Sequence, residues 1–277
     1  MRKTRRLKTS PKSMKNLLNK LKPRFADRDR EMHFLEHLDE FRTMLIRCIL
    51  TLVIATAVCI PLAKPLLYWM QAPLFHVAEA NHYTYELITT SPVEGFLQIV
   101  KVVFATGILT SLPLMIYFIA RFILPGLKPH EQKILVYGGL AGALLFAVGV
   151  AMCYFITLPV AVKIMFYFND YLGTTANWKI DAYLGFVMQL LIGFGLAFEL
   201  PLILLMLGRM GVVTVAQLCK YRRHVMVGIL IVAMVLTPPD VITQLQMAIP
   251  LYLLYELCIL ILRLTQRGAR KEKKGTE

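Results

Sequence analysis

The amino-acid sequence predicts an all-α polytopic membrane protein with six transmembrane helices. Of its 277 residues, 57% are hydrophobic and only 17% are charged, a composition too apolar for an ordinary soluble domain. A transmembrane helix needs about 20 mostly apolar residues. Runs that reach or approach this length lie at about 43–63, 96–120, 134–158, 182–207, 223–237 and 241–262.

The fifth of these runs is short. Its apolar part, residues 225–236, holds 12 residues, which would form a helix of about 18 Å. The hydrocarbon core of a bilayer is about 30 Å thick. Either the membrane thins beside this helix, or the helix is only part of a span.

The distribution of charge predicts the topology. The net charge is +14. Residues 1–30 carry twelve Lys and Arg against two Asp, and residues 263–277 carry six against two Glu. The segment between these ends is therefore neutral overall. Basic ends mark the cytoplasmic side of a membrane protein and favour anionic lipid, so we expect both termini to be cytoplasmic and no nucleic-acid partner.

Three parts follow along the chain. Residues 1–29 are expected to form a disordered basic arm, residues 30–262 a six-helix membrane domain, and residues 263–277 a basic cytoplasmic tail. Apolar residues from position 32 onward recur at near-helical spacing, which predicts an amphipathic helix leading into the first span. No cleavable signal sequence is evident. The arm also has the composition of an organelle transit peptide, so bacterial or organellar origin stays open.

Small residues and prolines predict how the spans pack. Gly138 and Gly142 lie four residues apart in the third run, the spacing that lets two helix backbones approach closely. Pro113 and Pro201 lie inside the second and fourth runs and predict kinks.

The outer connections carry their own signals. The loops 64–95 and 159–181 contain Tyr and Trp residues, which favour the membrane interface. Asp240 follows two prolines and is expected to cap the sixth helix. Cys59 and Cys153 lie toward the outer ends of their spans, and their pairing in a disulfide stays open.

Enzyme signatures are weak. The chain has neither a GxxxxGK[ST] phosphate loop nor a GxSxG nucleophile elbow. The segment HFLEH matches the spacing of an inverted zinc-protease motif, with His33 and His37 one helical turn apart. Because this short pattern lies in a charged helix without an evident third ligand, a face of an interfacial helix is the favoured reading. We expect no enzyme, no metal and no cofactor.

Carboxylates inside apolar runs are better evidence for function. Glu199 lies within the fourth run, where a charge at the bilayer centre costs roughly 3 kcal/mol on insertion scales. The favoured reading is a polar docking point for another membrane helix, or a proton or ion site. The alternative is a protonated carboxyl, or one bonded to a neighbouring helix. Glu256 is expected to reach the interface or to pair with Arg263.

Two further carboxylates are predicted to lie at the cytoplasmic face. Glu40 stands with Arg42 at the start of the first span, and Glu131 lies in the short loop after the second. Each reads most simply as a solvated charge. A ligand with two arginines would nevertheless find bidentate carboxylate partners there.

The chain resembles the TatC family of the twin-arginine protein translocase. The matching segments occur in the family's order and cover roughly residues 33–262. They are HLDEFR (37–42), QAPL (71–74), SPVEGF (91–96), FILPGLKPHE (122–131), FGLAFELP (194–201), LTPPDVITQ (236–244) and IPLYLLYE (249–256).

The resemblance implies a glove-shaped bundle of six helices in a bacterial cytoplasmic (inner) membrane. It implies a receptor and core subunit that binds Arg-Arg signal peptides of folded proteins and exports them with the proton-motive force. The implied partners are TatA- and TatB-type single-span proteins, signal peptides of folded cargo, further copies of the chain in a receptor complex, and membrane lipids.

Signal-peptide residues also follow from the resemblance. The family's carboxylates that match Glu40 and Glu131 bind the arginine pair, and Phe122, Pro125 and Leu127 match residues of the same recognition loop.

Partner contacts are implied in the same way. The glutamate matching Glu199 faces the concave side of the bundle and meets a polar group of a partner helix. The residues matching Pro73, Asp240 and Gln244 belong to outer segments and the TatA/TatB side, and Arg42 is assigned to partner contact or structure.

Departures from the family pattern are few. The basic arm is longer than usual, Phe41 stands where Leu is frequent, and Gln132 stands where a second basic residue is common. The main alternative function is a secondary transporter or ion channel that uses intramembrane carboxylates. Such proteins often carry inverted repeats, and none is visible here.

Overall fold

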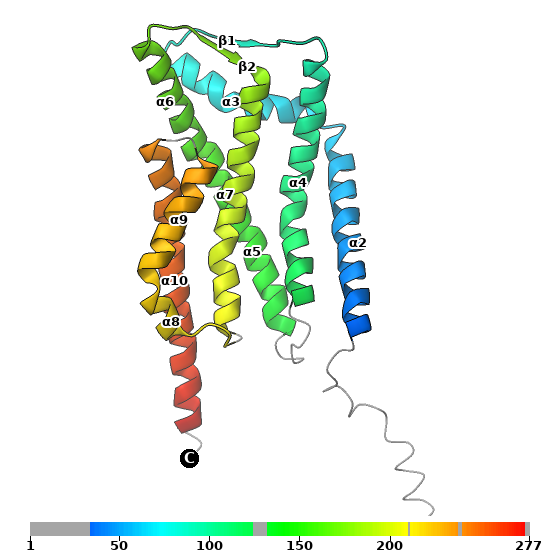
Figure 1. Cartoon of the computed structure of the whole chain (residues 1–277), viewed down its shortest axis with the longest axis vertical. Coiled ribbons are helices and arrows are strands. Elements are labelled where there is room, and N and C mark those ends of the chain that lie inside the picture. The colour runs from blue at the N-terminus through cyan, green and yellow to red at the C-terminus, as the bar shows by residue number, and fades with distance from the viewer. Residues whose placement is uncertain (1–33, 124–131, 210, 238–239, 275–277) are drawn as a thin grey trace, which may run out of the picture. The chain divides into compact units, whose positions relative to one another are not determined.

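The computed structural model describes residues 34–123, 132–209, 211–237 and 240–274. These residues are mostly helical (Figure 1), which confirms the predicted class of a polytopic helical membrane protein. In chain order the elements are α2 (Phe34–Cys59), α3 (Ala63–Ala80), β1 (Tyr85–Ile88), α4 (Glu94–Ile123), α5 (Gln132–Met152), the π-helix η1 (Cys153–Thr157), α6 (Leu158–Tyr171), β2 (Ala176–Lys179), α7 (Ile180–Arg209), α8 (Val215–Lys220), α9 (Arg222–Leu236) and α10 (Val241–Lys274).

The chain divides into two compact units, Met1–Thr43 and Met44–Glu277, with the boundary inside α2. The first unit is described from Phe34 onward, as the beginning of α2. Leu38 and Phe41 are exposed there and lie about one helical turn apart, as the sequence pattern predicts. The division into arm, membrane domain and tail stays a prediction.

Five helical segments in the described part of the chain are long and apolar enough to cross a membrane. α9 has only 15 residues, or about 22 Å of helix, and is the short fifth helix that the sequence predicts. The five long segments are Leu38–Cys59, Glu94–Phe122, Gly138–Tyr171, Ile180–Arg209 and Val241–Leu264.

The prediction of an outer loop at 159–181 is wrong for the first part of that range, which is helical. α5 continues through η1 into α6, so the third apolar segment runs to Tyr171. Leu158, Val162 and Phe166 are all buried, and their four-residue spacing gives α6 an apolar stripe that packs against α3. Likewise, the predicted outer loop 64–95 contains α3, whose buried stripe includes Met70, Leu74 and Val77.

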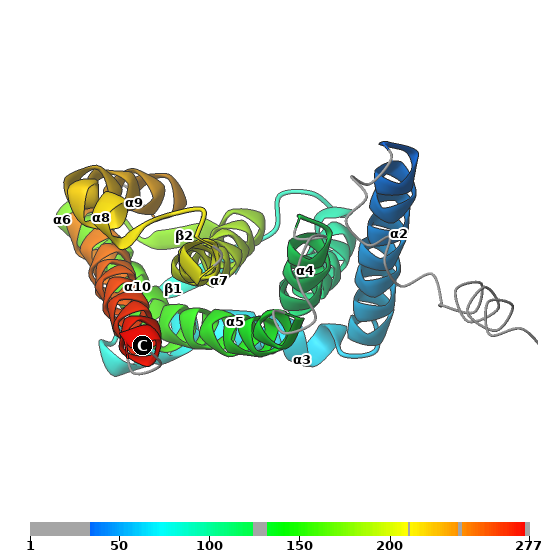
Figure 2. The ribbon, with the colours of Figure 1, turned by 90° about the horizontal axis from the view of Figure 1, so that it is seen from below.

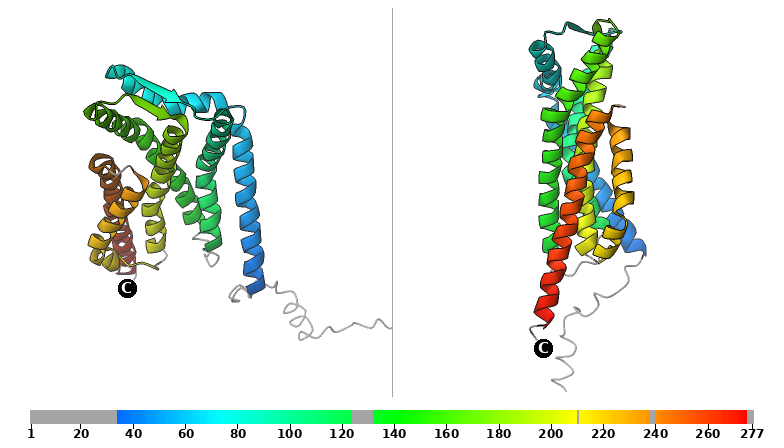
Figure 3. Two further views of the ribbon diagram at one scale, coloured as in Figure 1. Left: turned by 45° about the horizontal axis from the view of Figure 1, so that its top comes forward. Right: turned by 90° about the vertical axis from the view of Figure 1, so that its left-hand side faces the viewer.

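β1 and β2 form a short parallel pair that the sequence did not predict. Tyr85 pairs with Ala176, and the register continues to Ile88 with Lys179. Because the strands immediately precede α4 and α7 along the chain, their pairing brings the beginnings of those two helices together. Figure 1 and Figure 3 show α3, β1 and β2 at one end of the unit Met44–Glu277, which we call the α3 end.

α7 is the central helix of this unit. It packs against α4, α5, α9 and α10, and Figure 2 shows α5 below it, α4 on its right and α9 and α10 on its left. Its side chains Leu184, Val187, Leu190 and Phe194 are completely or almost completely buried. This packing fixes the buried face of α7 against its neighbouring helices.

Glycines of α5 allow the close approach to α7. A Cβ added at Gly138 would lie 2.8 Å from Met206 Cε, and one at Gly149 would lie 2.7 Å from Phe198 Cγ. Such separations are too short for carbon atoms in van der Waals contact. The close packing predicted from the glycine spacing is therefore confirmed.

The cysteines are free thiols, so Cys59 and Cys153 do not form a disulfide. Cys258 of α10 donates from Sγ to the carbonyl oxygen of Pro201 in α7, at 3.0 Å. Pro113 and Pro201 both lie within continuous helices, α4 and α7.

Candidate functional site

The carboxylate of Glu199 is buried in the middle of the bundle. The residue is only 2% exposed. Its Oε2 atom has no hydrogen-bond partner among the described residues. The alternative interpretation, in which Glu199 bonds to a neighbouring helix of the same chain, is therefore not supported for the Oε2 atom.

Room for this carboxylate comes from Gly142 of α5. A Cβ at that position would lie 2.9 Å from Glu199 Oε2 and 2.9 Å from Leu202 Cδ2. Any larger residue would have to displace the carboxylate or the leucine. The small residue at 142 is thus part of the site as well as part of the helix packing.

A small cavity of about 40 Å³ adjoins Glu199. Its lining comes from three helices: Pro113 and Tyr117 of α4, Gly139 of α5, and Met206 of α7 beside Glu199 itself. This volume is large enough for about one water molecule. The site therefore consists of one carboxyl group in an apolar groove, with space for one small polar group beside it.

The Oε2 atom of Glu199 is free to accept a hydrogen bond from a group outside the described residues. A buried polar atom without a hydrogen bond costs about 1–3 kcal/mol in protein mutational data. A single hydrogen bond from a side chain of another membrane helix contributes about 1–2 kcal/mol in model peptides. The arrangement can therefore support a directional and reversible contact between helices.

Asp240 caps α10, as the sequence predicts. Its Oδ2 accepts a hydrogen bond from the backbone N–H of Thr243 at 2.7 Å, and its Oδ1 accepts from the Thr243 hydroxyl at 2.6 Å. Gln244, in the same turn, donates from Nε2 to the carbonyl oxygen of Leu230 at 3.1 Å. Asp240 therefore stabilises the first turn of α10, and Gln244 joins that turn to α9.

Of the two alternatives that the sequence left for Glu256, pairing with Arg263 is wrong. Glu256 Oε2 lies 2.9 Å from Arg222 Nη2, and its Oε1 accepts a hydrogen bond from the Tyr252 hydroxyl at 3.2 Å. Arg263 instead donates from Nη2 to Cys219 Sγ at 2.7 Å. Arg222 and Glu256 become neighbours because α9 and α10 are antiparallel, a relation that spacing within one helix does not reveal.

The three carboxylates of the alternative ion-transport reading do not share a site. Glu199 lies between α4, α5 and α7, whereas Glu256 pairs with α9 and Asp240 caps α10. Within the residues that the structure describes, no group of three or more His, Cys, Asp or Glu could hold a metal ion. His33 and the side chain of His37 lie outside the described part.

The predicted signal-peptide residues are only partly described. Glu40 is exposed on α2, in the first unit, as is Arg42. Phe122 is half-buried near the end of α4 in the second unit. Glu131, Pro125 and Leu127 lie outside the described residues. Pro73, predicted for the partner side, is buried within α3.

Sequence reasoning missed an ion pair at the α3 end. Lys101 Nζ of α4 lies 2.6 Å from Asp181 Oδ1 of α7. Gln98, which is 2% exposed, donates to the same oxygen from Nε2 at 2.6 Å. The available signal was a lysine near the end of one span and an aspartate at the same depth in another.

The chain matches known proteins over most of its length. Residues 36–250 match the family Sec-independent protein translocase protein (TatC). A TatC protein of Aquifex aeolicus is 34% identical over 245 residues, which are 88% of this chain and all of the relative. A TatC protein of Akkermansia muciniphila is 39% identical over 177 residues, but the match spans only about half of that longer protein, 51%.

The fold matches solved structures as well. A crystal structure titled Twin Arginine Translocase Receptor-TatC superimposes with a TM-score of 0.70 at 36% identity, covering 83% of this chain and all of that one. A second structure of such a receptor, in the detergent DDM, also gives 0.70, at 34% identity and 82% coverage. The chain therefore belongs to the TatC family, and is a multi-pass bacterial inner-membrane component of the Sec-independent, twin-arginine protein translocase rather than an enzyme.

Proposed function

We propose that this chain is the receptor subunit of the twin-arginine translocase. It binds the Arg-Arg signal peptides of folded proteins and exports them together with TatA- and TatB-type partners, using the proton-motive force. The observation that carries this proposal is the match over most of the chain to a solved protein titled as a translocase receptor. Both termini are cytoplasmic in this proposal, in agreement with the basic ends of the sequence.

Recognition of the signal peptide rests on two carboxylates. Glu40 is exposed on α2, so its carboxylate is accessible to a peptide. Together with Glu131, it binds the two guanidinium groups of the signal through bidentate hydrogen bonds, which an ammonium group cannot reproduce. Phe122, Pro125 and Leu127 line the same recognition loop in this proposal.

Recruitment of partner helices rests on Glu199. Its buried Oε2 lacks a partner among the described residues, and the neighbouring cavity has room for one small polar group. A polar side chain of a single-span partner donates to this carboxyl group. Arg42, which is exposed on α2, contributes a further contact, and Pro73, which is buried within α3, has a structural role. Asp240 and Gln244 act by holding the α9–α10 turn in place for the partner.

The short helix α9 supports the translocation step. Its 15 residues extend over about 22 Å, less than the 30 Å of a typical hydrocarbon core. A bilayer that thins beside α9 presents a lower barrier to a passing chain. The proton-motive force supplies the energy in this proposal.

Binding of a twin-arginine peptide tests the receptor function. The full chain in detergent or nanodiscs is titrated with a signal peptide and with its Lys-Lys version. We expect the Arg-Arg peptide to bind at least about tenfold more tightly, which corresponds to about 1.4 kcal/mol, since charge-assisted bidentate pairs are stronger than single ones. Equal binding of the two peptides would remove the proposal.

A matched pair of variants tests the carboxylate. Glu40→Ala should weaken binding of the Arg-Arg peptide, whereas Asp39→Ala should leave it unchanged. Asp39 is an adjacent, exposed carboxylate on the same helix, so the pair separates a specific contact from a general loss of negative charge. Equal losses in both variants would argue for non-specific attraction instead of recognition by Glu40.

A further inference from the structure

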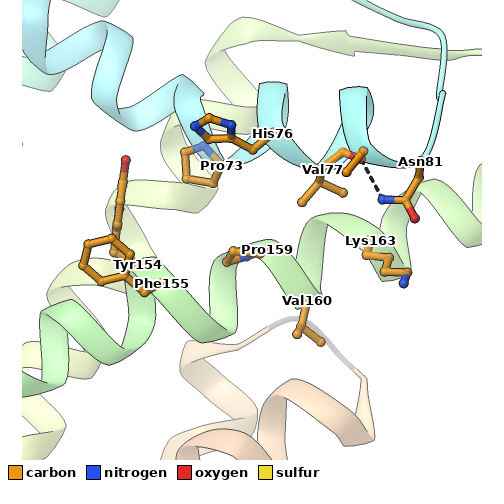
Figure 4. A pocket seen from close by; sticks show the side chains of 10 residues that line it. Pro73, His76, Val77, Asn81, Tyr154, Phe155, Pro159, Val160 and Lys163 are labelled. Atoms are coloured by element: carbon orange, nitrogen blue, oxygen red, sulfur yellow. Dashed lines mark hydrogen bonds between the residues drawn. The ribbon is translucent and has the colours of Figure 1, made fainter.

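A second cavity lies at the α3 end, away from Glu199. It has a volume of about 410 Å³ and is formed between α3 on one side and η1 with the beginning of α6 on the other. Figure 4 shows its side chains: Pro73, His76 and Val77 come from α3, and Tyr154, Phe155 and Lys163 come from the facing segment.

Part of the wall opposite α3 is a π-helix. The segment η1, Cys153–Thr157, interrupts the α-helical hydrogen bonding between α5 and α6. Insertions of this kind are rare and often lie at functional sites, because the extra residue changes the direction of the side chains. Here Tyr154 donates from its hydroxyl to the carbonyl oxygen of Trp69 in α3 at 2.9 Å, while Phe155 remains 73% exposed.

The cavity lies at the depth of a membrane interface. The apolar segment Gly138–Tyr171 has 34 residues, whereas about 20 residues of helix cross a 30 Å hydrocarbon core. In the sequence this apolar run begins at Ile134, so the far boundary falls near Cys153, in η1, and Lys163 lies about 15 Å of helix further along the chain. Trp69 and Tyr68, both largely exposed on α3, are side chains typical of this depth.

The charges at the cavity favour an anion. Lys163 lines it and is exposed, and Figure 4 shows its side chain at one side of the cavity with His76 at the other. Among the described residues that line it there is no carboxylate. Asn81 lies at the rim, where its Nδ2 donates to the Val77 carbonyl oxygen at 2.8 Å (Figure 4). Glu79 of α3 and Asp170 of α6 are exposed, but neither lines the cavity.

We propose that this cavity binds one anionic phospholipid. The phosphate group lies at Lys163, and the upper part of an acyl chain lies against Phe155, Val160 and Pro159. A cation above an apolar groove at interface depth is complementary to a lipid, which has its charge and its apolar chains in the same order. The binding site does not depend on the proposed signal-peptide recognition.

Lipid retention measured by native mass spectrometry tests the proposal. The full chain is reconstituted with equal amounts of phosphatidylglycerol and phosphatidylcholine, extracted in mild detergent, and analysed for bound lipid. The wild-type protein should retain phosphatidylglycerol preferentially. Lys163→Gln should lower the preference about fivefold, the effect expected for one Lys near an anionic surface.

Two control variants make the result specific. Lys64→Gln removes a lysine that is exposed on α3 but does not line the cavity, and should leave retention unchanged. Lys163→Arg keeps the charge and should retain the lipid. Equal loss in Lys64→Gln and Lys163→Gln would overturn the proposal, as would equal retention of both lipids by the wild type.

A partner protein is the competing occupant, and crosslinking distinguishes it. A photo-reactive group at position 163 should label phosphatidylglycerol in membranes that contain TatA- and TatB-type proteins. Labelling of a single-span partner in place of lipid would overturn the proposal and assign the cavity to that partner.

Discussion

Gly142 of α5 faces the carboxylate of Glu199 of α7 so closely that a Cβ at position 142 would lie 2.9 Å from Oε2. The two residues come from different apolar segments of the chain. Glu199 is the only charged residue between Asp181 and Arg209. Gly142 supplies the space for its side chain. The site therefore depends on both helices.

Gly142→Ala should lower the stability of the protein and disturb the carboxylate. Overpacking of this kind costs about 1–3 kcal/mol, because the helices must separate or Glu199 must change rotamer. The thermal midpoint in detergent should fall. Gly185→Ala in α7 is the control, since a Cβ there meets no atom within 4 Å. A midpoint for Gly142→Ala as high as that of the control would contradict the close packing.

Glu199→Leu should separate stability from function. Replacing an unpartnered buried polar group with an apolar one of similar size is neutral or stabilising, so the thermal midpoint should equal or exceed that of the wild type. Crosslinking to a TatA- or TatB-type helix should fall, while binding of the Arg-Arg peptide should not change. Undiminished crosslinking to the partner would show that Glu199 is not the contact.

Asp181→Ala should destabilise the α3 end more than Lys101→Ala does. Asp181 accepts hydrogen bonds from both Lys101 and the buried Gln98, so its removal leaves Gln98 Nε2 without that partner, at a cost of about 1–3 kcal/mol. Lys101 is half exposed, and a pair of this kind contributes about 1 kcal/mol or less. Thermal unfolding of the two single variants and the double variant measures both values; equal losses in the singles would argue against the Gln98 contact.

Asp240→Ala should weaken the start of α10 by about 1 kcal/mol, the usual cost of a lost N-cap. Asp240→Asn should keep most of this stability, because its side-chain oxygen still accepts the Thr243 N–H. Hydrogen exchange of the first turn of α10 is the measurement. If Asn and Ala were equally harmful, the charge of Asp240 and not its cap would matter.

Lengthening α9 should impair transport. Four leucines inserted after Ile231 add about 6 Å of helix and bring α9 close to the thickness of the hydrocarbon core. The export rate of a folded cargo should fall while peptide binding remains. Four leucines inserted into the long segment of α2 serve as the control. Unchanged export with an intact fold would count against membrane thinning beside α9.

The sequence by itself determined the membrane class, the six apolar runs and the short fifth helix, because each depends on the length and hydropathy of a continuous segment. The cap formed by Asp240 and the packing of the glycines of α5 were also readable, since both follow from local spacing. Seven short segments, in the order in which they occur, were enough to identify the family.

Only the tertiary structure decided which residues meet. The pairing of β1 with β2, the ion pairs Lys101–Asp181 and Arg222–Glu256, and the cavity between α3 and α6 all join segments far apart in the chain. Hydropathy does not specify which residues of two such segments come into contact, because any two apolar helices can pack together in many alignments of similar hydropathy. The contact of Gly142 with Glu199 depends instead on how α5 and α7 pack: the Glu199 side chain occupies the space that a side chain at position 142 would fill.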